Sequence, residues 1–283
     1  MSSNIARALV VGGTSGIGYG IACRIAQEAK SATVIISGRT KPSDIPHANI
    51  EFRKLDASSM SAIKTYTDAY KSSQEPKLDL LVLTQGIMTM TGRAETPEGI
   101  DRKMALHYYG RQQLIRELLP ALQDDAKVLI VLGTMGSPDN LNWTDLDLKS
   151  SFGVSAAAQH CMAMNDAMIQ YYAEQQKQTG KTRHFVHASP GVVNTSLGGE
   201  LPWYLRGSAR ILSTLLGVSP QVCGERMLKG TYECATLSEK QGRYWSYMDS
   251  KGKPVKNKAS WDDEQTQKVA SHTWKLIDGV SSS

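Results

Sequence analysis

Four glycines stand at the junction of a short apolar run and an apolar helical pattern near the start of the sequence. Gly12, Gly13 and Gly16 follow the apolar residues 8–11, and Gly18 lies at the beginning of a repeat of apolar positions over 17–25. This order predicts a strand, a tight turn and a helix. Backbone N–H groups of such a turn, with the helix N-terminus behind them, bind phosphate, although glycines also punctuate ordinary turns. The predicted phosphate-binding residues are Gly12, Thr14, Ser15, Gly16, Ile17 and Gly18.

An arginine after the next apolar run indicates which nucleotide this turn would hold. Residues 33–37 are β-branched and apolar, which predicts a buried parallel strand. Arg39 follows this strand with no acidic residue beside it. In dinucleotide-binding folds an acidic residue at this place binds the ribose of NAD, whereas arginine accommodates the 2′-phosphate of NADP. The sequence therefore predicts NADP(H) as cofactor, the alternative being a surface arginine after a strand.

The rest of the chain alternates strands with helices. Further strands are expected at 50–55, 78–83, 127–132, 184–188 and 243–247, and helices at 59–70, 96–122 (capped by Thr96, with Pro97 in its first turn), 154–176, 220–237 and 262–277. This alternation predicts one domain over 1–283, a single doubly wound parallel sheet of about seven strands with helices on both faces. Ligands of such sheets bind beyond the carboxyl ends of the strands. Asp56, Gly86, Thr134 and residues 190–195 stand at such ends, so we expect them near the glycine turn.

Composition narrows the kinds of partner. The formal net charge is +5, and no basic block is interleaved with aromatic residues, so we expect no nucleic-acid partner. The lysine-rich stretch 251–258 is expected to be a solvated loop. The four cysteines lack metal-ligand spacing, which predicts reduced thiols and no metal site. No apolar run approaches the roughly 20 residues of a membrane span, and no signal peptide is recognised. We therefore expect a cytoplasmic protein with a small-molecule substrate.

Taken together, these motifs resemble the short-chain dehydrogenase/reductase superfamily over nearly the full chain. The glycine turn is similar to the family's TGxxxGIG, and residues 83–86 stand where the family has NNAG, with only the glycine kept. The Arg39 pattern and the C-terminal layout resemble NADP-using, retinol-dehydrogenase-like members. The resemblance implies a Rossmann-like fold, an adenine contact for Asp56, and a nicotinamide contact for the segment after the sixth strand. The cofactor residues added by the resemblance are Asp56, Gly86, Pro190, Gly191, Val193 and Thr195.

The family's catalytic residues are an asparagine, a serine, a tyrosine and a lysine. The tyrosine exchanges a proton with the substrate oxygen, and a lysine one helical turn later holds the nicotinamide ribose and lowers the tyrosine pKa. The serine orients the carbonyl, and the asparagine keeps a water for proton transfer. Here His107, Gly133, Ala158 and Met162 stand in those four places. The YxxxK pattern at 247–251 follows a strand instead of lying on the expected helix, so we interpret it as chance.

Several nearby residues are candidates to replace the missing groups. His107 points to the site in the resemblance and is expected to titrate near neutrality. A one-residue shift would let Thr134 orient a substrate oxygen, and Asn165 shares the helix face of the replaced pair by i+7 spacing. For each, a structural role is the alternative: a helix histidine making a hydrogen bond, a turn hydroxyl, a buried amide. His160 is a weaker candidate on another face, and Asp166 is a candidate buried acid.

The replacement of a polar pair by Ala158 and Met162 predicts a wider, drier pocket that suits a bulky apolar ligand. Trp203 and Tyr204 lie in a segment, 197–220, that would form a lid or simply pack on the sheet. Unactivated ketones should react slowly without the tyrosine and lysine. Hydride transfer to a pre-formed cation such as an iminium needs no proton donor, and an enone or quinone can take its proton from elsewhere.

Three functions remain open from the sequence. The first is an NADP(H)-dependent oxidoreductase with a rearranged site, resembling members of the superfamily in fungal specialised metabolism. The second is a non-redox isomerase, cyclase or lyase, and the third is a cofactor-binding protein without catalysis. A homo-oligomer through the two long helices, 96–122 and 154–176, is also expected from the resemblance, although their apolar residues could equally cover the sheet.

Overall fold

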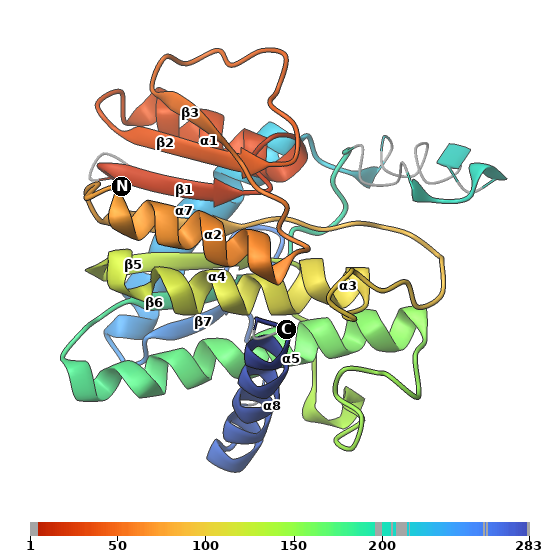
Figure 1. Ribbon diagram of the computed structural model, residues 1–283. Coiled ribbons are helices and arrows are strands. Elements are labelled where there is room, and N and C mark those ends of the chain that lie inside the picture. Colours follow the sequence, from red (N-terminus) through yellow and green to blue (C-terminus); the bar gives the residue numbers. More distant parts are fainter. Residues whose placement is uncertain are drawn as a thin grey trace.

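A parallel sheet forms the centre of the computed structural model, which describes residues 5–195, 200–204, 206–207, 214, 216–256, 258 and 260–281 (Figure 1). Within these residues, seven strands are arranged in the order β3-β2-β1-β4-β5-β6-β7. Their bounds are β1 Arg7–Val11, β2 Thr33–Gly38, β3 Ile50–Lys54, β4 Leu78–Leu83, β5 Leu122–Val131, β6 His184–Ala188 and β7 Trp245–Met248. The predicted doubly wound sheet is therefore confirmed. Parts of the predicted lid segment, 197–220, lie outside the described residues: 197–199, 205, 208–213 and 215.

Helices cover both faces of the sheet (Figure 1). On one face lie α1 (Gly16–Glu28) and α7 (Pro220–Glu239), and on the other lie α2 (Met60–Ser72), α4 (Gly110–Leu118) and α5 (Val154–Gln175). Successive strand residues alternate between the two cores, because side chains of a strand point to opposite faces. Leu9 packs in the α2/α4/α5 core and Val10 in the α1/α7 core. Burial on both faces explains why the strands are continuous apolar runs.

The helix predicted from Thr96 begins later and is divided. Asp101 is its cap, since its Oδ1 accepts hydrogen bonds from the backbone N–H groups of Lys103 at 2.9 Å and Met104 at 3.2 Å. The first turn, α3 (Arg102–Met104), is followed by a π-helical turn at Ala105–Tyr109 and then by α4. A π turn inside a helix is frequent at functional sites.

Glu98 would lie in the first turn of the helix predicted from Thr96, but in the structure it caps another helix. Its carboxylate accepts hydrogen bonds from the backbone N–H groups of Met60 and Ser61, each at 2.9 Å. Glu98 therefore caps α2 from a distant part of the chain instead of starting its own helix. Favourable interaction of an acidic side chain with a helix N-terminus explains the arrangement. The strand predicted at 127–132 also begins earlier, at Leu122.

The last helix, α8 (Asp263–Ser281), packs across the outer faces of α4 and α5. Tyr108 and Thr273 share a hydrogen bond of 2.6 Å, and the Arg116 guanidinium lies 4.7 Å from the centre of the Trp274 ring. An oligomer through the two long helices, which stays a prediction, would therefore have to include α8. The apolar α4 residues considered for such an interface are buried in the core: Leu114, Ile115 and Leu118. Among the described helices, none combines the length and the apolar character required to cross a lipid bilayer.

Candidate functional site

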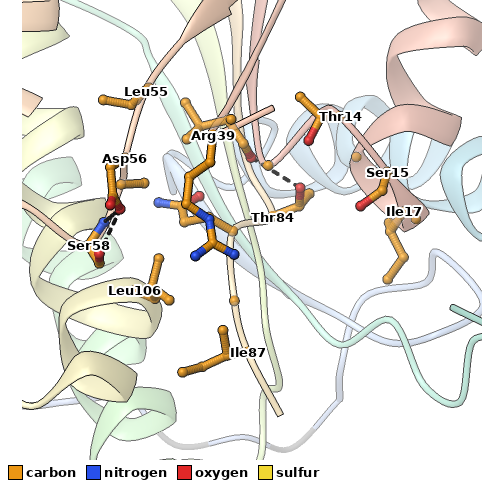
Figure 2. A pocket seen from close by; sticks show the side chains of 18 of the residues that line it. Thr14, Ser15, Ile17, Arg39, Leu55, Asp56, Ser58, Thr84, Ile87 and Leu106 are labelled. Atoms are coloured by element: carbon orange, nitrogen blue, oxygen red, sulfur yellow. Dashed lines mark hydrogen bonds between the residues drawn. The ribbon is translucent and has the colours of Figure 1, made fainter. Parts of the chain in front are cut away.

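A cavity of about 320 Å³ lies at the carboxyl ends of β1 to β4 (Figure 2). It brings together most of the residues that the sequence assigned to a cofactor: Gly12, Thr14, Ser15, Gly16, Ile17, Gly18, Arg39, Asp56, Gly86 and Thr195. Of the assigned residues, Pro190, Gly191 and Val193 do not line it, and neither do the catalytic candidates His107, Thr134 and Asn165. The residues that sequence reasoning missed include Ser58, Arg102 and Glu200.

The glycine turn is packed so closely that side chains are excluded. Gly12 has a φ of +80°, and a Cβ atom there would lie 2.6 Å from the backbone nitrogen of Gln85. A Cβ atom on Gly18 would lie 2.4 Å from the hydroxyl of Thr84. The Ser15 side chain makes no capping hydrogen bond to α1, so its first-turn N–H groups are left for a ligand in the cavity. The turn therefore fits a dinucleotide pyrophosphate.

Arg39 and Asp56 line the cavity at the ends of β2 and β3, and Figure 2 shows the Arg39 guanidinium directed into it. Burial opposes ionisation of Asp56, but hydrogen bonds from Ser58 outweigh it. Ser58 donates from its backbone nitrogen at 3.0 Å and from its hydroxyl at 2.6 Å. With the further help of the Arg39 and Arg102 charges, the pKa of Asp56 is lowered. The Asp56 carboxylate is thus ionised at neutral pH, and the charges of Arg39 and Arg102 act on it.

The segment after β6 reaches the glycine turn through Thr195. A Cβ atom on Gly16 would lie 3.4 Å from the methyl group of Thr195. Val193 forms a β-bridge with Val218, which places it beside the start of α7 and outside the cavity. Gly191 has a φ of +69° and packs against Ser250. Of residues 190–195, Thr195 therefore reaches the glycine turn, whereas Gly191 and Val193 pack outside the cavity.

His107 lies in the π-helical turn and is engaged with the end of β4. Its Nε2 accepts a hydrogen bond from the backbone nitrogen of Ile87 at 3.0 Å, so the proton is on Nδ1. Burial, assisted by the charge of Arg111, lowers the pKa of His107 to about 3. Burial and the Arg111 charge thus favour the neutral imidazole, which argues against the expected titration of His107 near neutrality.

Asn165 is fully buried on α5, where its amide joins three parts of the chain. The amide nitrogen donates to the carbonyl oxygens of His107 at 2.9 Å and Cys161 at 2.7 Å, and the amide oxygen accepts from Gln112 at 2.8 Å. The amide thus supports the π-helical turn, whose extra residue leaves a carbonyl without its usual helical partner. His160, the weaker candidate, accepts from the backbone nitrogen of Asn142 at 3.0 Å and is likewise engaged in the fold.

Met162 and Gly133 are in direct contact at the carboxyl end of β5. A Cβ atom on Gly133 would lie 2.8 Å from the sulfur of Met162. The apolar side chain on α5 therefore occupies space next to the strand where the family's serine would project. Ala158, one turn earlier on α5, is exposed. The contact between Met162 and Gly133 is thus apolar, and neither these two residues nor Ala158 line the cavity.

A buried ionic cluster at the other side of β5 was missed in the sequence. Asp166 is fully buried, accepts a hydrogen bond of 2.7 Å from Nδ1 of His187, and pairs with the ammonium group of Lys258. Burial lowers the pKa of His187 despite the neighbouring carboxylate. The Lys258 ammonium also donates to the carbonyl oxygen of Thr134 and lies 4.4 Å from the centre of the Tyr247 ring.

The cluster corrects the expectation for the lysine-rich stretch 251–258. Lys251 is exposed, whereas the side chain of Lys258 is 12% exposed. A buried acid at 166 was a sequence candidate, and such an acid needs a cation. The partner lies 92 residues further along the chain, so local spacing gives no sign of it. The phenol of Tyr247 accepts from Gln170 at 2.6 Å, away from Lys251, which agrees with reading the YxxxK pattern as chance.

Arg111 carries a second buried charge near the cavity. It is 1% exposed and donates to the carbonyl oxygens of Leu106 at 3.3 Å, Val131 at 2.9 Å and Gln85 at 2.6 Å. Burial lowers the pKa of Arg111 to about 9, so the guanidinium stays charged at neutral pH. Among the described residues no carboxylate pairs with it. It ties the carboxyl ends of β4 and β5 to the start of α4.

The aromatic residues proposed for a lid do not line the cavity. Trp203 is 82% exposed and Tyr204 is 64% exposed. Their two rings contact one another at 6.0 Å between centroids.

Comparison with known proteins finds similar sequences and similar folds among dehydrogenases, reductases and oxidoreductases. Residues 6–139 match the short chain dehydrogenase family. Over 202 residues the chain is 35% identical to oxidoreductase AN1596 from Emericella nidulans, covering 67% of this chain and 59% of that protein. It is 26% identical over 230 residues to polyprenol dehydrogenase from Homo sapiens, covering 75% and 68% of the two. NADPH-bound carbonyl reductase from chicken fatty liver has the same fold, with a TM-score of 0.62, 20% identity and coverage of 91% and 99%.

The chain spans less than two thirds of the length of the first relatives it matches, from 58% to 60%. The match to the family nonetheless includes the glycine turn, β1 to β5 and all the residues that line the cavity except Thr195 and Glu200. Sequence matches, sheet order and the phosphate-binding turn agree with one another, and the chain belongs to the short-chain dehydrogenase/reductase superfamily.

Proposed function

We propose that the protein is an NADP(H)-dependent oxidoreductase that acts on a bulky apolar carbonyl, enone or iminium substrate. One observation carries the proposal: Arg39 lines the same cavity as the glycine turn, in a position to meet a 2′-phosphate. The chicken carbonyl reductase with the same fold binds NADPH, and the human relative is named for an apolar alcohol. A role in specialised metabolism and a cytoplasmic location stay predictions.

The residues of the chain divide the binding of such a cofactor among them. The glycine turn and the N-terminus of α1 would hold the pyrophosphate, Arg39 the 2′-phosphate, and the wall that includes Asp56 the adenosine. When bound, the nicotinamide supplies or accepts a hydride. Gly86 and the turn at Pro190, Gly191, Val193 and Thr195 are proposed contacts for that half of the cofactor.

Charge near the reacting groups comes from positions other than the family's tyrosine and lysine. Arg111, which pairs with no carboxylate among the described residues, places a cation at the ends of β4 and β5, and such a cation favours negative charge developing on a substrate. Thr134 is the candidate to orient a substrate oxygen, with its backbone held by Lys258. His107 and Asn165 position the π-helical turn, and we propose no proton transfer for them.

This arrangement favours acceptors whose reduction by hydride does not depend on a tyrosine that protonates a carbonyl oxygen, such as an iminium, which already carries a positive charge, or an enone or quinone, which can take its proton from elsewhere. The experiment is a fluorescence titration with NADPH and NADH, followed by NADPH oxidation assays with a cyclic enone, a quinone, a cyclic iminium and an unactivated ketone. Tight NADPH binding with turnover of the enone or the iminium supports the proposal. Tight binding without turnover of any acceptor would favour a cofactor-binding protein or a non-redox enzyme, because Ala158 and Met162 leave no obvious proton donor. Absence of binding to both nucleotides would refute the proposal.

A further inference from the structure

Two charged residues from distant parts of the chain form an ion pair at the edge of the cofactor cavity. Arg102, the first residue of α3, donates from Nη1 to one carboxylate oxygen of Glu200 at 3.1 Å and from Nη2 to the other at 2.9 Å. Both side chains line the cavity. They are 36% and 41% exposed, so the pair is open to water and to exchange with another ligand.

Arg102 also acts on the adenosine end of the cavity. Its charge and that of Arg39 both contribute to lowering the pKa of Asp56, so both guanidinium groups lie within electrostatic reach of that carboxylate. Four charged residues therefore line one cavity, two cations and two anions: Arg39, Arg102, Asp56 and Glu200. The Asp56 carboxylate accepts its hydrogen bonds from Ser58, whereas the Glu200 carboxylate pairs with Arg102.

A carboxylate in this place is unfavourable for a phosphorylated ligand. The planar fork of an arginine fits a carboxylate and a phosphate in the same bidentate way. A nucleotide phosphate carries more negative charge than a carboxylate, and a partly exposed ion pair is held weakly. We propose that Arg102 is a second phosphate-binding residue of the cavity and that Glu200 pairs with it until the nucleotide binds. This inference rests on the proposed function and names its cofactor-recognition residues.

Because Glu200 competes with the nucleotide phosphate for Arg102, it lowers the affinity for the nucleotide. Removing its charge should release Arg102 and also remove repulsion of the incoming phosphate. The substitution Glu200→Gln is therefore expected to tighten NADPH binding about fivefold, the effect of one partly exposed ion pair. Arg102→Ala should weaken NADPH binding by a similar factor. In the Arg102→Ala background, Glu200→Gln should have a much smaller effect than in the wild type.

The test is a set of fluorescence titrations with NADPH and NADH at low ionic strength. Glu174→Gln, an exposed glutamate of α5 that lines no part of the cavity, is the matched control. Effects on NADPH alone would assign Arg102 to the 2′-phosphate, and equal effects on both nucleotides would assign it to the pyrophosphate. Thermal unfolding of each variant establishes that the fold is kept, and Arg102→Lys, which keeps the charge but loses the fork, provides a milder change.

The outcomes separate this inference from the proposed function. If the wild type binds NADPH while Glu200→Gln behaves as Glu174→Gln does, the exchange of partners is wrong and the proposed function stands. The inference is also overturned if Arg102→Ala and Arg102→Lys bind both nucleotides as tightly as the wild type. If the wild type binds neither nucleotide, the proposed function fails, and the inference fails with it.

Discussion

The sulfur of Met162 lies 2.8 Å from the place that a Cβ atom on Gly133 would take, so the side chain of one residue fills the space of the other. In the alignment proposed from the sequence, both residues take the places of polar catalytic groups of the superfamily. The contact means that the two positions are coupled: a larger residue at 133 requires a smaller or displaced one at 162. Under that alignment, the replacement of the serine and the replacement of the lysine are one coupled change in apolar packing.

This coupling predicts how the two positions respond to substitution. Gly133→Ser alone should destabilise the protein by about 1–3 kcal/mol, because the added side chain forces Met162 from its place. In the Met162→Ala background the same change should cost far less. Urea unfolding of the two single variants and the double variant measures the coupling free energy. Additive effects would show that the two side chains do not compete for space.

Arg39→Ala is expected to weaken NADPH binding roughly 10- to 100-fold, the loss of charged hydrogen bonds to a phosphate. NADH binding should change little, because NADH has no 2′-phosphate. Paired fluorescence titrations measure the ratio of the two dissociation constants, with Lys41→Ala, two positions further along, as a control for general charge. Equal losses for the two nucleotides would contradict the assignment of Arg39.

Lys258→Met should destabilise the fold by about 3 kcal/mol, because Asp166 would keep a buried carboxylate without its cation. The double variant with Asp166→Asn should be more stable than Lys258→Met alone, since both charges are then removed. Thermal and urea unfolding measure this order, and Lys251→Met, an exposed neighbour, is the control. Equal stability of Lys258→Met and Lys251→Met would show that Asp166 does not need this partner.

Stability should depend on pH through His107. Its pKa of about 3 in the folded protein lies below the ordinary histidine value of about 6.5. The unfolded chain therefore binds a proton first as the pH falls, and the contribution of neutral His107 is complete above about pH 6.5 and is lost toward pH 3. One such group changes the free energy of unfolding by up to about 1.4 kcal/mol per pH unit.

His107→Gln tests this dependence, because the glutamine oxygen can still accept a hydrogen bond from Ile87. Between pH 6.5 and pH 4, the free energy of unfolding of the variant is expected to fall less steeply than that of the wild type. This range lies between the ordinary pKa of about 6.5 and the folded-state pKa of about 3. Urea unfolding at a series of pH values gives both slopes. Parallel curves would mean that His107 keeps an ordinary pKa in the fold.

Features that depend on neighbouring residues were predictable from the sequence. The glycine turn, β1, β2 and β6 follow from short apolar runs and from turns that need glycine, and each was found within a residue of its predicted place. The buried strands are apolar on both faces because helices cover both faces. Arg39 and Asp56 could be placed at the cavity because parallel strands bring their carboxyl ends to one edge.

Features that depend on partners far along the chain were not predictable. Glu98 resembled the first turn of its own helix, but its carboxylate caps α2. Lys258 resembled a solvated lysine, yet the buried carboxylate of Asp166 holds it. Arg102 and Glu200 carry no local signal at all, since each resembles an ordinary surface charge until the fold brings them together.

The position of Lys258 has a consequence for local opening of the structure. Its ammonium group links the carboxylate of Asp166 on α5 to the backbone carbonyl of Thr134 after β5. Opening of the segment that carries Lys258 would leave a buried carboxylate without its cation, so this segment and α5 should open together.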